Sequence, residues 1–190
     1  MDNAADNLKD AAWRVRWASE KSQRYHARRT AFFSRWNRVT AFAGICAASA
    51  VFASLTDAAP AWLASAGALF VLVMSGVDLV IGSAEMARKH DDLRRRFCEL
   101  EADIHRAPEP TAEQVAAWSV RRLAIEADEP PTHVALDLLC DNELRRAHDY
   151  RGTQGPRSVH WLKALTAQFF RWYNTAPGRP LLPESNGPST

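Results

Sequence analysis

Two apolar runs separated by a short polar link constrain this chain more than any other feature of its sequence. Residues 39–56 contain no charged side chain over eighteen positions, and residues 58–77 contain none over twenty. Runs of about 18 or more such residues can cross the hydrocarbon layer of a membrane as a helix. Neither run has the polar stripe of a water-facing surface helix. The sequence therefore predicts two membrane spans, at about 39–56 and 61–82.

The basic residues predict the orientation of the two spans. Residues 1–38 carry nine Lys or Arg against four Asp or Glu, and five more bases lie between residues 88 and 96. The link, TDAAP, contains one acid and no base. By the positive-inside rule, both termini are cytoplasmic and the link faces out. A hairpin buried inside a soluble helical protein is the alternative, because alanine-rich helices containing Gly44 and Gly67 also pack in that way.

The residues outside the spans predict further helices. Residues 1–38 form a basic helix with aromatic residues among the arginines, and such a helix either lies on anionic lipid or packs on neighbouring helices. Nucleic-acid binding is a weaker option, since no nucleic-acid module accompanies the bases. Thr111 and Gln114 form a capping box for a helix that runs to about Ala127. Another helix follows Pro130–Pro131, and the stretch 159–173 is amphipathic.

A heptad seam follows the second span. Apolar residues and one histidine recur there at spacings of three and four: Met86, His90, Leu93, Phe97, Leu100 and Ile104. Such a seam predicts that the second span extends as one rod, which either self-associates or packs on the helices after Thr111. The seam position of His90 is typical of a packed histidine, although its pKa class leaves a pH-sensitive role open.

The predicted fold class is therefore all-α, with a two-helix transmembrane hairpin, an N-terminal amphipathic helix and a C-terminal cytoplasmic helical bundle. Its four regions are a cytoplasmic basic aromatic helix (1–38), the hairpin (39–84), a cytoplasmic helical region (85–173) and a disordered tail rich in proline and glycine (174–190).

The stretch 125–144 is the richest candidate for chemistry, because six acids lie there with His133 and Cys140. A metal or acid/base site is conceivable, but the spacing matches no defined site. Acids beside a helix break and at the start of the next helix explain the pattern without a ligand. The chain also has no phosphate loop, nucleophile elbow or HExxH motif. We therefore expect no enzyme activity, catalytic residue, cofactor or bound metal.

Asp78 carries more informative chemistry than the acidic stretch. It lies in the second apolar run, near the predicted inner edge of the hydrocarbon layer. A carboxylate there is costly unless it meets water or a partner, so it is a candidate for a pore or gating residue. The alternative is that Asp78 reaches the nearby interface and pairs with Ser75 or Arg88.

Small residues at intervals of three and four permit close approach of the spans. Two helices from one chain cannot enclose a pore, whereas several chains can, so a homo-oligomer in the lipid bilayer is expected. The candidates for helix association are Gly44, Ala48, Ala64, Ala68, Leu93, Phe97 and Leu100.

The segment RRLAIEADEPPTHVALDLLCDNELRRA, together with the hairpin and the basic lead helix, resembles the SLATT family of bacterial two-transmembrane effectors. The residues that carry this tail signature are Glu126, Asp128, Glu129, Pro130, Asp137, Cys140, Asn142 and Glu143. The resemblance implies a pore-forming or membrane-disrupting effector in the bacterial inner membrane. It also implies antiviral defence beside a nucleotide synthase or nucleotide sensor. A membrane anchor that recruits a cytoplasmic partner is the alternative, and a membrane enzyme is the least favoured.

Overall fold

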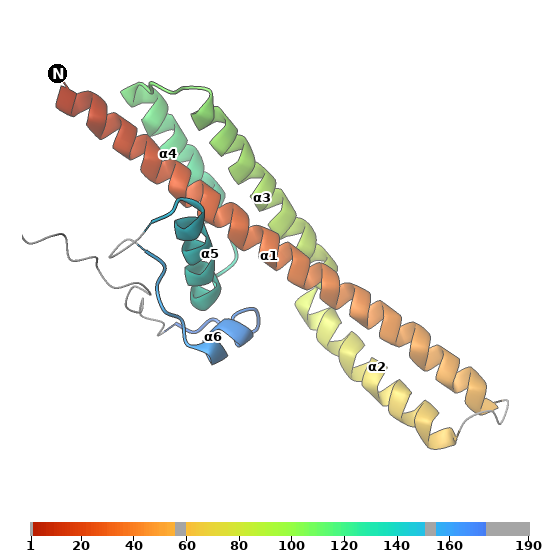
Figure 1. Ribbon diagram of the computed structural model, residues 1–190. Coiled ribbons are helices and arrows are strands. Elements are labelled where there is room, and N and C mark those ends of the chain that lie inside the picture. The colour runs from red at the N-terminus through yellow and green to blue at the C-terminus, as the bar shows by residue number, and fades with distance from the viewer. Residues whose placement is uncertain (1, 56–59, 151–154, 174–190) are drawn as a thin grey trace, which may run out of the picture. The chain divides into compact units, whose positions relative to one another are not determined.

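The computed structural model describes residues 2–55, 60–150 and 155–173, and the elements in them are helices, as predicted. In chain order these are α1 (Asp2–Leu55), α2 (Ala61–Ile81), α3 (Ser83–His105), α4 (Ala112–Ala127), α5 (Val134–Ala147) and α6 (Trp161–Thr166) (Figure 1). The contacts divide the chain into two units. Met1–Ala27 with Asp92–Thr190 form the bundle unit, and Arg28–Asp91 form the hairpin unit.

The first helix is longer than the sequence analysis predicted. We expected a lead helix that ends at residue 38 and a separate span from residue 39, but α1 continues for 54 residues through both. Neither proline nor glycine occurs before Gly44, so no backbone signal interrupts the helix there. After residue 38 the side chains change from charged to apolar, so the helix prefers different surroundings there, but its backbone continues as the same helix.

The α3 seam forms the interior of the bundle unit. Leu93, Phe97 and Leu100 are completely or almost completely buried. They pack in one cluster with residues of α1 and α4, namely Ala12, Val15, Val115, Trp118 and Ile125. The prediction that the seam packs on the helix after Thr111 is confirmed. Because these three residues have no surface left for a second copy, they are core residues within one chain and not the intermolecular contacts we considered.

The predicted boundaries of α4 are confirmed. The Gln114 backbone N–H donates to Thr111 Oγ1 at 3.2 Å, and the Thr111 N–H donates to Gln114 Oε1 at 2.9 Å. This reciprocal capping box satisfies two donors that would otherwise lack partners at the start of the helix. The helix ends at Ala127, and α5 begins after Pro130–Pro131.

The amphipathic stretch 159–173 forms a shorter helix than predicted. One further helical bond follows α6, from the Phe170 N–H to the Thr166 carbonyl at 3.1 Å. The Arg171 carbonyl then accepts from the Val134 N–H at 3.0 Å, and the Trp172 indole donates to Thr166 Oγ1 at 3.1 Å, with Trp172 in the left-handed backbone region. The contact with Val134 and the left-handed residue replace continuation of the helix. The predicted disordered tail, 174–190, lies outside the described residues.

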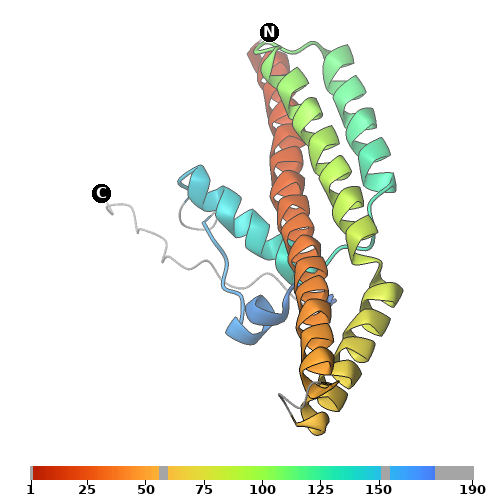
Figure 2. The same cartoon turned by 90° about the vertical axis from the view of Figure 1, so that its right-hand side faces the viewer.

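In the hairpin unit, α2 lies beside the C-terminal part of α1 in both views (Figures 1 and 2). Large apolar side chains of both helices point outward, with exposed fractions of 67% for Phe42, 70% for Phe52, 70% for Leu72, 85% for Leu79 and 87% for Val80. Among the described residues, one helical stretch, Trp62–His105, is long and apolar enough to cross a membrane, and none of its most apolar window is buried.

Candidate site around Asp78 in the hairpin unit

Asp78 lies on the inner face of α2. The less exposed positions of this helix recur at intervals of three or four residues, at Ala64, Gly67, Val71, Met74 and Asp78. Residues at these intervals share one face of a helix. The next two residues, Leu79 and Val80, are the most exposed large apolar residues of the unit. The carboxylate of Asp78 is therefore turned away from the outer surface of the hairpin.

The closest approach of the two helices occurs at Gly67. A Cβ atom built on Gly67 would lie 3.7 Å from both the Cα and the Cβ of Ala47. The sequence analysis predicted that small residues let the spans approach closely, and the residues in this contact are indeed small. Ala64 lies on the inner face, whereas the other three candidates do not make this contact: Gly44 has open space around it, and Ala48 and Ala68 are exposed.

Trp36 lies at the level of Asp78 on the facing helix. The Gly67–Ala47 contact sets the register, and the helices run antiparallel because only a short link joins them. Asp78 lies 78 − 67 = 11 residues after Gly67, and Trp36 lies 47 − 36 = 11 residues before Ala47. An indole N–H is only a donor and a carboxylate is only an acceptor. The register therefore places complementary groups at one level of the hairpin.

Polar atoms without partners gather in the hairpin unit. In the described part of the chain, buried atoms that lack a hydrogen bond include Thr30 Oγ1, Trp36 Nε1, Asp78 Oδ1 and Ser83 Oγ. Each buried polar group without a partner costs about 1–3 kcal/mol. The pairings considered for Asp78, with Ser75 or Arg88, do not satisfy its buried oxygen. Sequence reasoning placed Trp36 at the membrane entry but did not connect Trp36 or Ser83 with Asp78, although Trp36 shares the three-and-four spacing with Ala43 and Ala47.

Gly82 separates α2 from α3 directly after this level. Its φ of 62° lies in the left-handed region, and its N–H donates to the Asp78 carbonyl at 2.8 Å. Glycine reaches this conformation without the steric cost of a Cβ atom. Gly82 therefore interrupts the expected rod at one residue, but the Met86 N–H donates to the Gly82 carbonyl at 2.9 Å and α3 follows directly. Asp78 lies in the last turn of α2.

A compact aromatic layer occupies the end of the hairpin unit near Ser83. The ring of His90 stacks on that of Phe33 at a centroid distance of 5.7 Å, and the Arg29 guanidinium lies 4.5 Å from the same Phe33 ring. All three side chains are buried. The prediction that His90 is a packed seam residue is confirmed. The guanidinium of Arg29 therefore brings a positive charge into this aromatic layer.

Four of the five acids of the tail signature each lie beside a different basic residue of the bundle unit. Ion pairs join Lys21 to Asp137 at 3.0 Å and Arg96 to Asp128 at 2.6 Å, Arg122 pairs with Glu126 within α4, and His26 Nε2 lies 3.1 Å from Glu129 Oε1. No group of three or more potential ligands in the described residues could hold a metal ion. These acids therefore have separate partners and do not converge on one point.

The other residues of the tail signature also lie in positions that a structural role explains. Cys140 is completely buried in a cluster with Tyr25 and Ala135. Asn142 forms two hydrogen bonds with the backbone of Arg157, with its Nδ2 donating at 2.7 Å and its Oδ1 accepting at 2.6 Å. Pro130 lines a shallow hollow beside α1, and Glu143 is half-buried.

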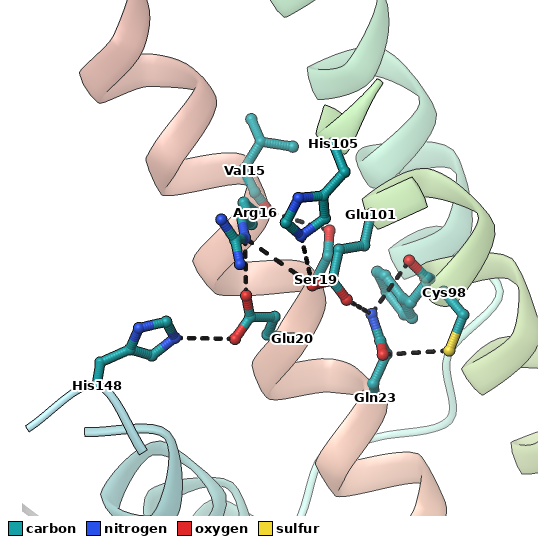
Figure 3. A network of polar contacts seen from close by, with 10 residues as sticks. Val15, Arg16, Ser19, Glu20, Gln23, Cys98, Glu101, His105 and His148 are labelled. Atoms are coloured by element: carbon teal, nitrogen blue, oxygen red, sulfur yellow. Dashed lines mark hydrogen bonds and ion pairs between the residues drawn. The ribbon is translucent and has the colours of Figure 1, made fainter. Parts of the chain in front are cut away.

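A polar network that sequence reasoning missed joins α1 to the end of α5 and to α3 (Figure 3). Glu20 accepts from Arg16 Nε at 2.8 Å and lies 3.0 Å from His148 Nε2. Burial raises the pKa of Glu20, but the hydrogen bonds from His148 and Arg16 outweigh that effect and lower it. The rings of Trp13 and Trp17 lie 5.2 Å and 5.5 Å from that of His148. This part of the lead helix therefore packs on its neighbours, one of the two options left open.

Comparisons with protein-family models, with curated proteins and with solved structures found no match. The function is therefore inferred from the geometry of the hairpin unit and from the sequence resemblance.

Proposed function

We propose that this chain is an effector of the bacterial inner membrane, whose two apolar segments cross the bilayer as a hairpin and assemble with further copies into a conducting or disruptive structure. The observation that carries this proposal is the arrangement of the hairpin. Large apolar side chains lie outside, small residues make the closest helix contact, and the carboxylate of Asp78 lies on the inner face. Helices in lipid associate through small residues, and acids among them are usually functional.

Two crossings are supported by the outer surface of α1. Phe42, Ile45 and Phe52 are each at least 66% exposed in the segment before the link, so this segment also presents an apolar exterior. The link is too short to hold a domain, and bases flank the hairpin on both outer sides while none lies in the link. Under the positive-inside rule this arrangement places both termini in the cytoplasm.

Asp78 is the proposed gating residue. In a single hairpin α1 covers its carboxylate, and Oδ1 has no partner within the described residues. A water-filled path shared between copies would solvate this oxygen and remove that cost. The exposed residues Ala48 and Ala68 supply small side chains for close approach of a neighbouring copy. Opening then requires that α1 and α2 separate at the level of Asp78 and Trp36.

The family resemblance suggests when the channel opens. A nucleotide synthase or nucleotide sensor encoded nearby would supply the signal, and the assembled effector would arrest the infected cell. The bundle unit is the proposed receiver of this signal, because its helices α1 and α3 continue into the hairpin unit.

A non-catalytic anchor is the second candidate function, and one observation favours it. The α3 seam is filled by residues of the same chain, so the bundle unit needs no second copy to complete its core. An anchor of this kind would recruit a partner through its surface and leave the membrane sealed.

Recordings from the full-length protein in planar bilayers test the effector proposal. Asp78→Asn keeps the size of the side chain and removes its charge, so we expect normal expression and oligomer size but a lower preference for cations in the current. Ser75→Ala is the matched control, because Ser75 is an exposed polar residue on the same helix. Its current should equal that of the parent.

Two outcomes would contradict this proposal in different ways. Equal conductance and equal ion preference for the parent and Asp78→Asn, at matched protein density, would remove Asp78 from the mechanism. An intact membrane potential during induced expression of the parent would exclude a constitutively active effector. If addition of the neighbouring nucleotide signal also produced no depolarisation, the anchor function would replace the effector function.

A further inference from the structure

The segment from residue 155 to 173, here called the aromatic segment, is fastened to α5 by its backbone. The Val134 N–H donates to the Arg171 carbonyl at 3.0 Å, and Asn142 bonds twice to the backbone of Arg157. The His133 ring lies 3.3 Å from the Phe170 carbonyl oxygen. These contacts involve main-chain atoms of the segment and leave most of its large side chains out of the core.

The aromatic segment buries a small side chain and exposes most of its large apolar ones, which is the reverse of what a core element does. The residue that enters the buried cluster with Tyr25 and Leu136 is a small one, Ala167. The large apolar residues point outward, each at least 42% exposed: Trp161, Leu162, Leu165, Phe169, Phe170 and Tyr173. So many large apolar side chains on one short segment exceed what a water-facing surface ordinarily carries.

The charge around these residues has one sign. No acid occurs between Asp149 and Glu184, whereas five Arg or Lys residues do. Of the three bases that the structure describes, Arg171 is exposed, and Arg157 and Lys163 are half-buried. Elsewhere in the bundle unit, acids and bases alternate and pair, as Lys21 does with Asp137. The patch therefore complements a negatively charged apolar surface.

We propose that the aromatic segment binds the surface of an anionic phospholipid membrane. Trp and Tyr rings are favoured at the boundary between lipid and water, and bases among them are attracted to anionic headgroups. Lys163 lies over the Trp172 ring at 5.8 Å, and Arg171 donates to the Tyr173 hydroxyl at 2.9 Å. Tyr173 is exposed, so its ring and the charge of Arg171 lie at one place, whereas Lys163 lies beside a ring that packs against the buried cluster.

An acid-free basic patch favours lipid over a second copy of the chain. A self-complementary contact would bring like charges of two identical patches together, since the same surface meets itself across a two-fold axis. An anionic bilayer instead gains from every base, by a factor of about five in binding for each one near the surface.

Fluorescence of the full-length protein in lipid nanodiscs tests this inference. An environment-sensitive label is placed at Leu165→Cys in a background with Cys46→Ala and Cys98→Ala, because Cys140 is buried. The nanodiscs contain zwitterionic lipid alone or mixed with phosphatidylglycerol. Lipids with a spin label near the headgroup should quench the label strongly in the anionic discs and weakly in the zwitterionic ones. The same label at Leu123→Cys is the control, since Leu123 is also an exposed apolar residue but lies on α4.

The charge is tested separately by the double variant Lys163→Glu, Arg171→Glu. The quenched fraction in anionic discs should then correspond to a docking constant at least about 25-fold smaller, from two bases at about fivefold each. Circular dichroism checks that the helices remain folded. The variant Phe169→Ser, Phe170→Ser should also lose quenching while it keeps the bases.

Several results would overturn the inference. Equal quenching in both kinds of disc, or none at Leu165→Cys, would exclude an anionic lipid surface. Quenching that grows with the number of chains per disc would assign the patch to a second copy, and quenching that rises on removal of residues 174–190 would assign it to the tail. Asp78→Asn should dock as the parent does, so failure of the gating proposal and failure of this inference are distinguishable.

Discussion

The bundle unit and the hairpin unit use the same three-and-four spacing of inward positions, but different kinds of residue make their closest helix contacts. In the bundle unit, the inner face of α3 carries the large residues Leu93, Phe97 and Leu100. In the hairpin unit, the closest helix contact is made by Gly67 and Ala47, while Leu79 and Val80 point outward.

The difference is the one expected between a unit packed in water and a unit packed in lipid. Water drives large apolar side chains into the interior, because burial removes their surface from contact with water. Lipid tails are as apolar as leucine and exert no such drive, so helices in lipid pack through small residues. The membrane proposal therefore predicts this sorting of side chains in the hairpin unit.

The largest loss of stability that would test this comparison is expected from a substitution in the core of the bundle unit. Phe97→Ala should lower the free energy of unfolding of this unit by about 3–5 kcal/mol, because it removes a completely buried ring and leaves a cavity. Leu79→Ala in the hairpin should change it by less than about 0.5 kcal/mol, since that side chain is exposed. Guanidinium unfolding of the protein in nanodiscs, followed by circular dichroism, measures both. Equal losses would mean that the two units do not differ in where their large residues act.

A smaller effect is expected at the closest contact of the hairpin. Gly67→Leu should destabilise the helix pair by about 1–3 kcal/mol, because a Cβ at Gly67 already lies in van der Waals contact with Ala47 and a longer side chain has no room. Gly44→Leu is the matched control, since nothing lies within 4 Å of its Cβ position. Titration with a denaturing detergent, followed by energy transfer between labelled helix ends, measures the separation. A larger effect at Gly44 would place the helix contact elsewhere.

The smallest effect concerns pH and is confined to the bundle unit. The folded state holds the pKa of Glu20 below its ordinary value of 4.5, so the stability that Glu20 contributes is present above that value and is lost as the pH falls through the lowered pKa. Glu20→Gln should therefore flatten the acid side of the curve of Tm against pH. Thermal scans between neutral and acid pH measure this change. An unchanged acid limb would show that the network around His148 does not contribute to the pH dependence.

Much of the fold was predictable from local patterns. The capping box of Thr111 and Gln114 and the buried seam from Leu93 to Ile104 were both found from spacing, because each involves neighbours on one helix. The seam pattern could not say whether its partner was a second chain or α4. Likewise, small residues were predicted to mediate contact within the hairpin, but the pair that meets, Ala47 and Gly67, depends on how each helix is rotated.

The candidate site divides in the same way between sequence and structure. The sequence by itself determined that an acid, Asp78, lies within a long apolar run, because composition and length are properties of the chain. Only the tertiary structure decided that this acid faces inward at the level of Trp36 and that Glu20 meets His148. It also decided that α6 stops at Thr166. These features depend on contacts between residues far apart in the chain, or on competition with such contacts. The rotation and register of the packed helices decide which residues meet, and no local sequence pattern encodes that rotation or register.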